Sequence, residues 1–149
     1  MTRSAAGDVL TDVVMRTFRL YGDFLEAAEV MAKPVGLTAA WWQVLGAVLK
    51  EPLSVSGIAR EMGLTRQSVQ RIADLLVDKG LAEYLPNPAH RRAKLFGPTG
   101  AGYEAIGNLR EAQHAWANRI SAQVDAAELR TTLDVMNRLV KALDADHAP

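Results

Sequence analysis

The stretch LTRQSVQRIADLL, residues 64–76, has two chemically different faces when its residues are placed on a helical wheel. At about 100° per residue, one side carries only apolar side chains: Val69, Ile72, Ala73 and Leu76. The opposite side, an arc of roughly 140°, gathers Arg66, Gln67, Gln70, Arg71 and Asp74. Such a helix packs its apolar face on a core and presents its polar face to solvent or a partner. This segment therefore limits the possible folds more strongly than any other part of the sequence.

The neighbouring residues predict where this helix begins and what precedes it. Thr65 is an N-cap residue and Gly80 ends the helix. Residues 54–63 predict a short helix, in which Gly57 costs roughly 1 kcal/mol relative to alanine. The turn at residues 62–64 then joins the two helices into a helix-turn-helix.

After Gly80 the pattern changes from helical to extended. LAEYL, PNPAH and RRAKLF, residues 81–96, predict a strand, a tight loop and a second strand. The loop is stiff and basic, with His90, Arg91 and Arg92 at its tip. It predicts a wing that reaches the minor groove of DNA or its phosphates; a solubilising hairpin without a partner is the alternative.

The polar face of residues 66–76 has the chemistry of a helix that reads double-stranded DNA. Arginine pairs bidentately with guanine, and glutamine with adenine, in the major groove. Thr65, Ser68 and the positive end of the helix dipole add contacts to phosphate. The alternative is a winged-helix protein-interaction module that does not bind DNA.

Charge is distributed unevenly although the whole chain is neutral, with 17 basic and 17 acidic residues. Residues 54–97 contain seven Lys/Arg against four Asp/Glu, which is +3, whereas residues 121–149 contain three against five, which is −2. A basic middle segment favours an anionic partner.

The flanking segments predict long helices. We expect helices over residues 8–33, 38–50 and 99–124, and a last helix that begins with a capping box at Asp125 and Glu128. The last helix carries a heptad seam: Leu129, Leu133, Met136, Val140 and Leu143. This seam predicts a homodimer, an ordinary amphipathic helix on its own core being the alternative.

The predicted fold is therefore mainly α with a small β-hairpin wing. A winged helix-turn-helix core, residues 38–98, is flanked by dimerisation helices in residues 1–37 and 99–149. The GPTGAG motif, residues 97–102, is expected to be a strand-to-helix joint rather than a phosphate loop.

Other classes of protein find no support in the sequence. There is no cysteine, no long apolar run and no secretory leader, which fits a cytoplasmic protein. The three histidines lack metal-ligand spacing, and no catalytic motif is present. We expect no enzyme, no cofactor, no metal and no membrane partner.

Taken together, GLTRQSVQRIADLLVDKGLAEYLPNPAHRRAKLFGPTGAG and the upstream LTAAWWQVL resemble the MarR family. The resemblance implies a homodimeric regulator, usually a repressor of a pseudo-palindromic operator, that releases DNA on binding a small aromatic or phenolic ligand. It implies recognition-helix roles for Thr65, Arg66, Gln67, Ser68, Gln70 and Arg71, and wing roles for Arg91 and Arg92. His90 stands where the family commonly has an acidic residue that holds the wing.

Candidate effector-binding residues follow from the same resemblance. Trp41 and Trp42 are adjacent, so one packs in the core and the other is free to line a cleft. Arg16, Tyr21 and His114 lie on helices that the family places around its ligand pocket, where a cation beside aromatic rings suits a carboxylate or phenolate. Core packing and solvated faces are the alternative roles.

Overall fold

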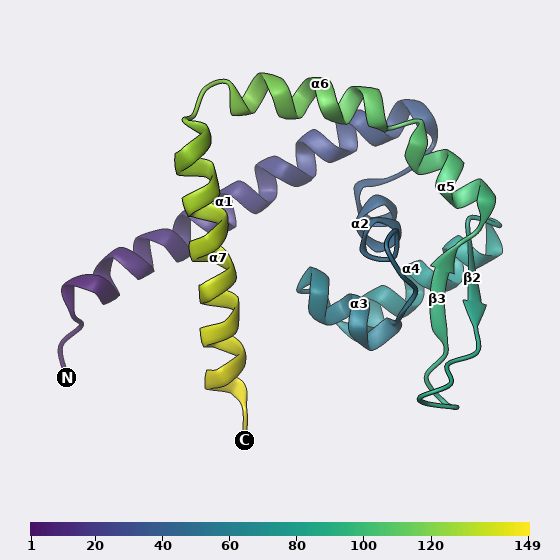
Figure 1. Cartoon of the computed structure of the whole chain (residues 1–149), viewed down its shortest axis with the longest axis horizontal. Helices are drawn as coiled ribbons and strands as arrows, with labels where there is room; N and C mark the ends of the chain where they lie inside the picture. Colours follow the sequence, from purple (N-terminus) through teal and green to yellow (C-terminus); the bar gives the residue numbers. More distant parts are fainter. The chain divides into compact units, whose positions relative to one another are not determined.

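The computed structural model describes all residues, 1–149, and is mainly helical with one small antiparallel sheet (Figure 1). The chain forms two compact units, Met1–Arg110 and Glu111–Pro149. The first unit contains the helices α1 (Ala5–Ala32), α2 (Ala39–Ala47), α3 (Val55–Met62), α4 (Arg66–Asp78) and α5 (Gly100–Gly107). Helix α6 (Arg110–Ser121) begins at the boundary, and α7 (Ala126–His147) completes the second unit. The predicted fold class is confirmed.

The helices begin where the sequence places capping side chains. Each N-cap oxygen accepts a hydrogen bond from the backbone N–H three residues later, which satisfies one of the unpaired amides of the first turn. The predicted caps that do so are Thr38, Ser54, Thr65, Thr99 and Asp125. Helix α3 ends at Gly63, whose φ of 65° lies in the left-handed region that glycine adopts without strain.

The core of the first unit lies where α2, α3 and α4 meet the sheet. It contains the whole predicted apolar face of α4: Val69, Ile72, Ala73 and Leu76. Three of these side chains are completely buried and Ile72 is 6% exposed. They pack with Val44 and Leu45 of α2, Ile58 of α3 and Phe96 of the sheet.

The sheet has three strands in the order β1-β3-β2, namely β1 (Leu53–Ser54), β2 (Ala82–Leu85) and β3 (Leu95–Pro98). The predicted hairpin is confirmed, with Tyr84 opposite Phe96. The second strand begins at Leu95, however, and not at Arg91 as the sequence suggested. Two prolines in the loop cannot donate to a strand ladder, and so the wing loop is longer than expected.

The helix predicted over residues 99–124 is two helices, α5 and α6, separated at Asn108–Leu109. Gly107 and Asn108 are weak helix formers. The Leu109 N–H bonds to the carbonyl of Ile106, three residues back, which tightens the last turn of α5. Leu109 itself is 1% exposed and packs with Ala32 and Leu37.

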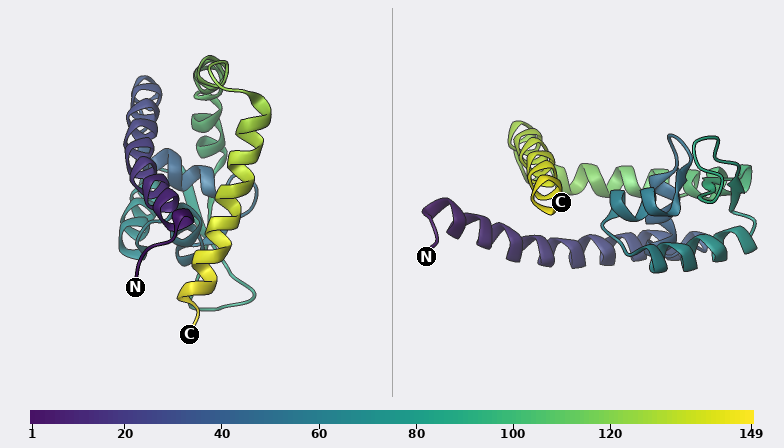
Figure 2. Two further views of the ribbon diagram at one scale, coloured as in Figure 1. Left: turned by 90° about the vertical axis from the view of Figure 1, so that its left-hand side faces the viewer. Right: turned by 90° about the horizontal axis from the view of Figure 1, so that it is seen from below.

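Long apolar stripes stay uncovered in the single chain. Only Ala32 of α1 is buried, and no residue of α7 is buried. Figure 2 shows the N-terminal part of α1 projecting away from α2, α3 and α4. Phe18 is 68% exposed on α1 and Leu133 is 60% exposed on α7. Despite these stripes, none of the helices combines the length and the hydropathy needed to cross a bilayer.

The GPTGAG motif forms the predicted joint between a strand and a helix. The Thr99 hydroxyl donates to the carbonyl of Gly80 at 2.7 Å and accepts from the N–H of Gly102 at 3.2 Å. The Thr99 N–H donates to the carbonyl of Leu81. A Cβ atom at Gly102 would lie 2.0 Å from that same carbonyl oxygen, so only glycine fits where α5 meets the start of the hairpin.

We therefore predict that Gly102→Ala lowers the free energy of unfolding by about 2–3 kcal/mol, because the added methyl group collides with backbone. Gly107→Ala is the matched control on the same helix, since a Cβ there meets nothing within 4 Å. It should leave stability unchanged or raise it by up to about 1 kcal/mol. Urea unfolding followed by circular dichroism, at matched protein concentration, measures both; equal effects would contradict the close approach at Gly102.

Candidate nucleic-acid interface

Helix α4 presents its polar residues to solvent because its apolar face is fixed in the core. Thr65, Arg66, Gln67, Gln70 and Arg71 are all exposed. Ser68 differs, since it is half-buried and lines a second pocket against α1 and α2. Arg66 and Gln70 are one helical turn apart, which places them on the side of α4 that faces the wing.

The wing, residues 86–94, is held by an asparagine and not by an ion pair. Asn87 donates from Nδ2 to the carbonyl of Ala93 at 2.8 Å and accepts from the N–H of Ala89 at 3.1 Å. None of the three ion pairs of the chain lies in the wing. His90, Arg91 and Arg92 are exposed, so their charges and hydrogen-bond donors are available to a partner.

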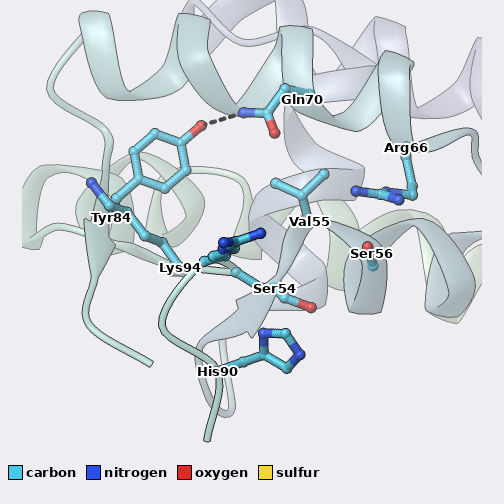
Figure 3. Close-up of a pocket in the computed structure, with 10 residues that line it drawn as sticks. Ser54, Val55, Ser56, Arg66, Gln70, Tyr84, His90 and Lys94 are labelled. Carbon is cyan, nitrogen blue, oxygen red and sulfur yellow. Dashed lines mark hydrogen bonds between the residues drawn. The ribbon is translucent and has the colours of Figure 1, made fainter. Parts of the chain in front are cut away.

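A groove of about 480 Å³ separates the start of α4 from the wing (Figure 3). It is lined by Ser54, Val55, Ser56, Arg66, Gln70, Tyr84, His90, Arg92, Ala93 and Lys94. The lining contains arginine, lysine and histidine side chains and no aspartate or glutamate. Basic side chains that converge on one hollow favour an anionic partner such as a phosphate backbone. The other predicted DNA-contacting residues lie outside this lining: Thr65, Gln67, Ser68, Arg71 and Arg91.

A ring of three hydrogen bonds ties α4 to the wing strand β2. The Tyr84 hydroxyl donates to Oδ1 of Asp74 at 2.5 Å. Gln70 Nε2 donates to the same Asp74 oxygen at 3.0 Å and to the Tyr84 hydroxyl at 2.9 Å. Burial, together with the hydrogen bond to Asp74, raises the pKa of Tyr84 to about 12.

Tyr84, Asn87 and Lys94 are interface residues that the sequence did not single out. Tyr84 and Asn87 act through partners on another element or across the hairpin, and helical periodicity carries no information about such partners. One local signal was available, because Gln70 and Asp74 are four residues apart on the same helical face. Their link to Tyr84 depends on how β2 packs on α4.

The predicted effector residues are not gathered in one place. Tyr21 lines a pocket of about 300 Å³ with Leu25, Glu29, Ala39, Ala40, Gln43, Leu64, Ser68 and Ile72. Arg16 is exposed on α1 and outside this lining. Trp41 and Trp42 are half-buried and pack against the core clusters, and His114 is exposed on α6 in the other unit. Nowhere do three His, Asp or Glu side chains converge as metal ligands would.

A short helix, a turn, a solvent-facing second helix and a hairpin beside it define a winged helix-turn-helix protein. The sequence model of the MarR family matches residues 35–93, which include α2, α3, α4 and β2 and end in the wing loop before β3. An uncharacterised protein of Mycobacterium tuberculosis is 38% identical over 139 residues, which are 93% of this chain and 97% of that protein. The chain belongs to the MarR family of transcription regulators.

Solved structures of the family share the fold over most of the chain. CouR from Rhodococcus jostii, bound to p-coumaroyl-CoA, superposes with a TM-score of 0.77 at 22% identity, over 87% of this chain and 92% of CouR. A mutant MarR from E. coli in complex with operator DNA superposes with a TM-score of 0.73 at 18% identity, over 91% of this chain and 99% of that chain. Identities this low establish the shared fold; they do not transfer ligands or contacts.

Burial, together with the hydrogen bond to Asp74, predicts an unusual titration for Tyr84. Because its pKa is raised from 10.0 to about 12, Tyr84 should stay protonated at pH 11, where an unperturbed tyrosine is largely ionised. The stabilisation it gives the fold is present below pH 10 and is lost as the pH rises through 12. The difference in absorbance at 295 nm between wild type and Tyr84→Phe isolates this titration. Asp74→Asn should move it towards 10, and a wild-type midpoint near 10 would contradict the burial of Tyr84 and its bond to Asp74.

Proposed function

We propose that this protein is a cytoplasmic, non-enzymatic transcriptional regulator that binds double-stranded DNA as a homodimer and represses transcription until a small ligand releases it. The observation that carries the proposal is the basic groove between α4 and the wing. The groove belongs to a unit whose core fixes the polar face of α4 outward. An exposed basic helix tip beside a basic hairpin suits a duplex, which offers a groove and two phosphate backbones.

In the proposed complex, α4 enters the major groove with its N-terminus first. Arg66 pairs with guanine, and Gln67, Gln70 and Arg71 contact neighbouring bases or phosphates. Thr65 and Ser68 assist at the helix N-terminus, where the dipole favours phosphate. His90, Arg91 and Arg92 of the wing contact the minor groove or its phosphates. The complex of E. coli MarR with operator DNA supports this mode, since the two chains share the fold.

Two copies of the chain are proposed to associate through the helices of residues 1–37 and 99–149, leaving residues 38–98 to bind DNA. The support is the exposed apolar surface: Leu133, Met136, Val140 and Leu143 are each more than half exposed. Apolar stripes of this kind mark protein interfaces. A two-fold dimer requires a pseudo-palindromic operator with half-site centres about 10 bp apart.

The ligand is proposed to be a small aromatic or phenolic compound bound near Tyr21, in the pocket between α1, α2 and α4. This pocket reaches the recognition helix through Leu64, Ser68 and Ile72, so an occupant would contact α4 directly. CouR, which shares the fold, holds an aromatic acyl thioester. Release of DNA requires that the ligand bind the DNA-free geometry more tightly. The other predicted ligand residues, Arg16, Trp41, Trp42 and His114, lie outside the lining of this pocket.

The DNA-binding proposal predicts different losses of DNA affinity for substitutions in α4 and in the wing. Arg66→Ala should weaken operator binding by about 1–3 kcal/mol and relax the base preference at one position. Arg92→Ala should weaken binding to all sequences and reduce the slope of log K against log salt by about 1. Fluorescence anisotropy over a salt series measures both, with Arg130→Ala on α7 as the control. A wild-type protein without salt-dependent binding to random duplex would indicate a protein-interaction module instead.

The dimer proposal predicts that acidic residues in the seam separate the subunits. Leu133→Glu combined with Val140→Glu places four charges in the proposed interface, where each lost apolar side chain contributes about 1.5–3 kcal/mol. The dissociation constant should rise at least about 100-fold. Sedimentation equilibrium measures it, and Thr131→Glu, on the opposite face of α7, should behave as wild type. A double variant as dimeric as the wild type would show that α7 is not the interface.

A further inference from the structure

We infer that the pocket beside Tyr21 binds an aromatic ammonium compound, that is, an apolar ring that carries a cationic amine, and disfavours aromatic carboxylates. The residue that selects the charge is Glu29 of α1, which lines the pocket. The inference rests on the proposed function, because it names the class of ligand for the pocket that was proposed there.

The charge of this pocket is the reverse of what the sequence suggested. The predicted cations, Arg16 and His114, lie outside the lining, and no lysine, arginine or histidine takes their place. Glu29 is the only charged residue in the lining. A bound carboxylate would therefore face a like charge with no cation to compensate it, whereas an ammonium group would gain an opposite charge.

Glu29 also takes the position at the start of α2 that would otherwise attract a bound anion. The positive end of a helix favours negative charge, and Ala39, the first residue of α2, lines the pocket. The N–H of Ala39 already donates to Oε2 of Glu29 at 2.9 Å. A helix end carries roughly half a positive charge, so it offsets only part of the carboxylate charge. The second oxygen, Oε1, makes no hydrogen bond in the protein and is available to an ammonium donor.

Helix α1 presents an aromatic ring, an apolar side chain and a carboxylate in a row. Tyr21, Leu25 and Glu29 follow one another at intervals of four residues, and all three line the pocket. At about 1.5 Å per residue, the row is about 12 Å long. An aromatic body packs along Tyr21 and Leu25 while an amine on a short chain reaches Glu29. The row therefore matches a ligand with one apolar and one cationic end.

The residues that α2 and α4 contribute to the pocket are apolar or neutral. Gln43 and Ser68 are half-buried, and their side chains make no hydrogen bond within the protein. They are able to donate or accept, so they orient a ligand without changing the preference for its charge. The pocket volume of about 300 Å³ lies at the lower end of the range for small-molecule sites. It suits one ring with a short chain.

Isothermal titration calorimetry at pH 7 and low salt tests the inference with probes that share one skeleton: phenylpropylamine, phenylpropanol and phenylpropanoate. Wild type should bind the amine about tenfold more tightly than the alcohol, and the propanoate more weakly than the alcohol. Glu29→Gln should lose most of the preference for the amine, while its amide oxygen still accepts the hydrogen bond from Ala39. Glu26→Gln is the matched control, since it removes the same charge from an exposed position of α1 outside the lining. It should bind like wild type.

The outcomes separate this inference from the proposed function. A wild type that prefers the propanoate, or binds none of the probes, would overturn the inference and leave DNA binding intact. The same holds if Glu29→Gln, shown to be folded by circular dichroism, keeps the full preference for the amine or loses no more of it than Glu26→Gln does. Binding of wild type to random duplex DNA, measured separately with and without the amine, tests the proposed function. Absence of duplex binding would overturn that function, whatever charge the pocket prefers.

Discussion

Burial of the apolar face of α4 is the constraint from which the rest of the interface follows. Val69, Ala73 and Leu76 have no exposed surface, and they touch side chains from α2, α3 and β3. Turning the helix by one residue, about 100°, would remove these side chains from the core. It would carry basic and amide groups into a core that contains no buried polar side chain to pair with them. The orientation of Arg66 and Gln70 is therefore fixed by residues on the opposite side of their own helix.

Hydrogen bonds, rather than ion pairs, set the position of the wing relative to α4. Asn87 braces the loop internally, Tyr84 joins β2 to α4, and Thr99 joins the end of the hairpin to the turn after α4. Ion pairs at a surface weaken as salt rises, whereas hydrogen bonds of this kind are affected less. These hydrogen bonds do not involve the side chains of His90, Arg91 and Arg92. The basic groups of the wing therefore stay free for an anionic partner.

A single copy of the chain leaves a large apolar surface exposed. A compact core is built by α2, α3, α4 and the sheet, yet α1 and α7 carry large apolar side chains that nothing in their own unit covers. Phe18 and Leu133 are among the most exposed of these. Burying them between two copies would be favourable by the hydrophobic effect. The same association would set the spacing of two α4 helices.

The sequence alone determined several features that depend on neighbours along the chain. Thr65 and Thr99 cap their helices, the apolar face of α4 is buried, and the hairpin follows Gly80, since capping and periodicity act within a few residues. Tertiary structure decided the rest. Leu109, at the break in a predicted helix, packs with Ala32 and Leu37, and Gln70 is hydrogen-bonded to Tyr84 of β2. Contacts between distant segments depend on how elements pack, and local pattern does not encode that packing.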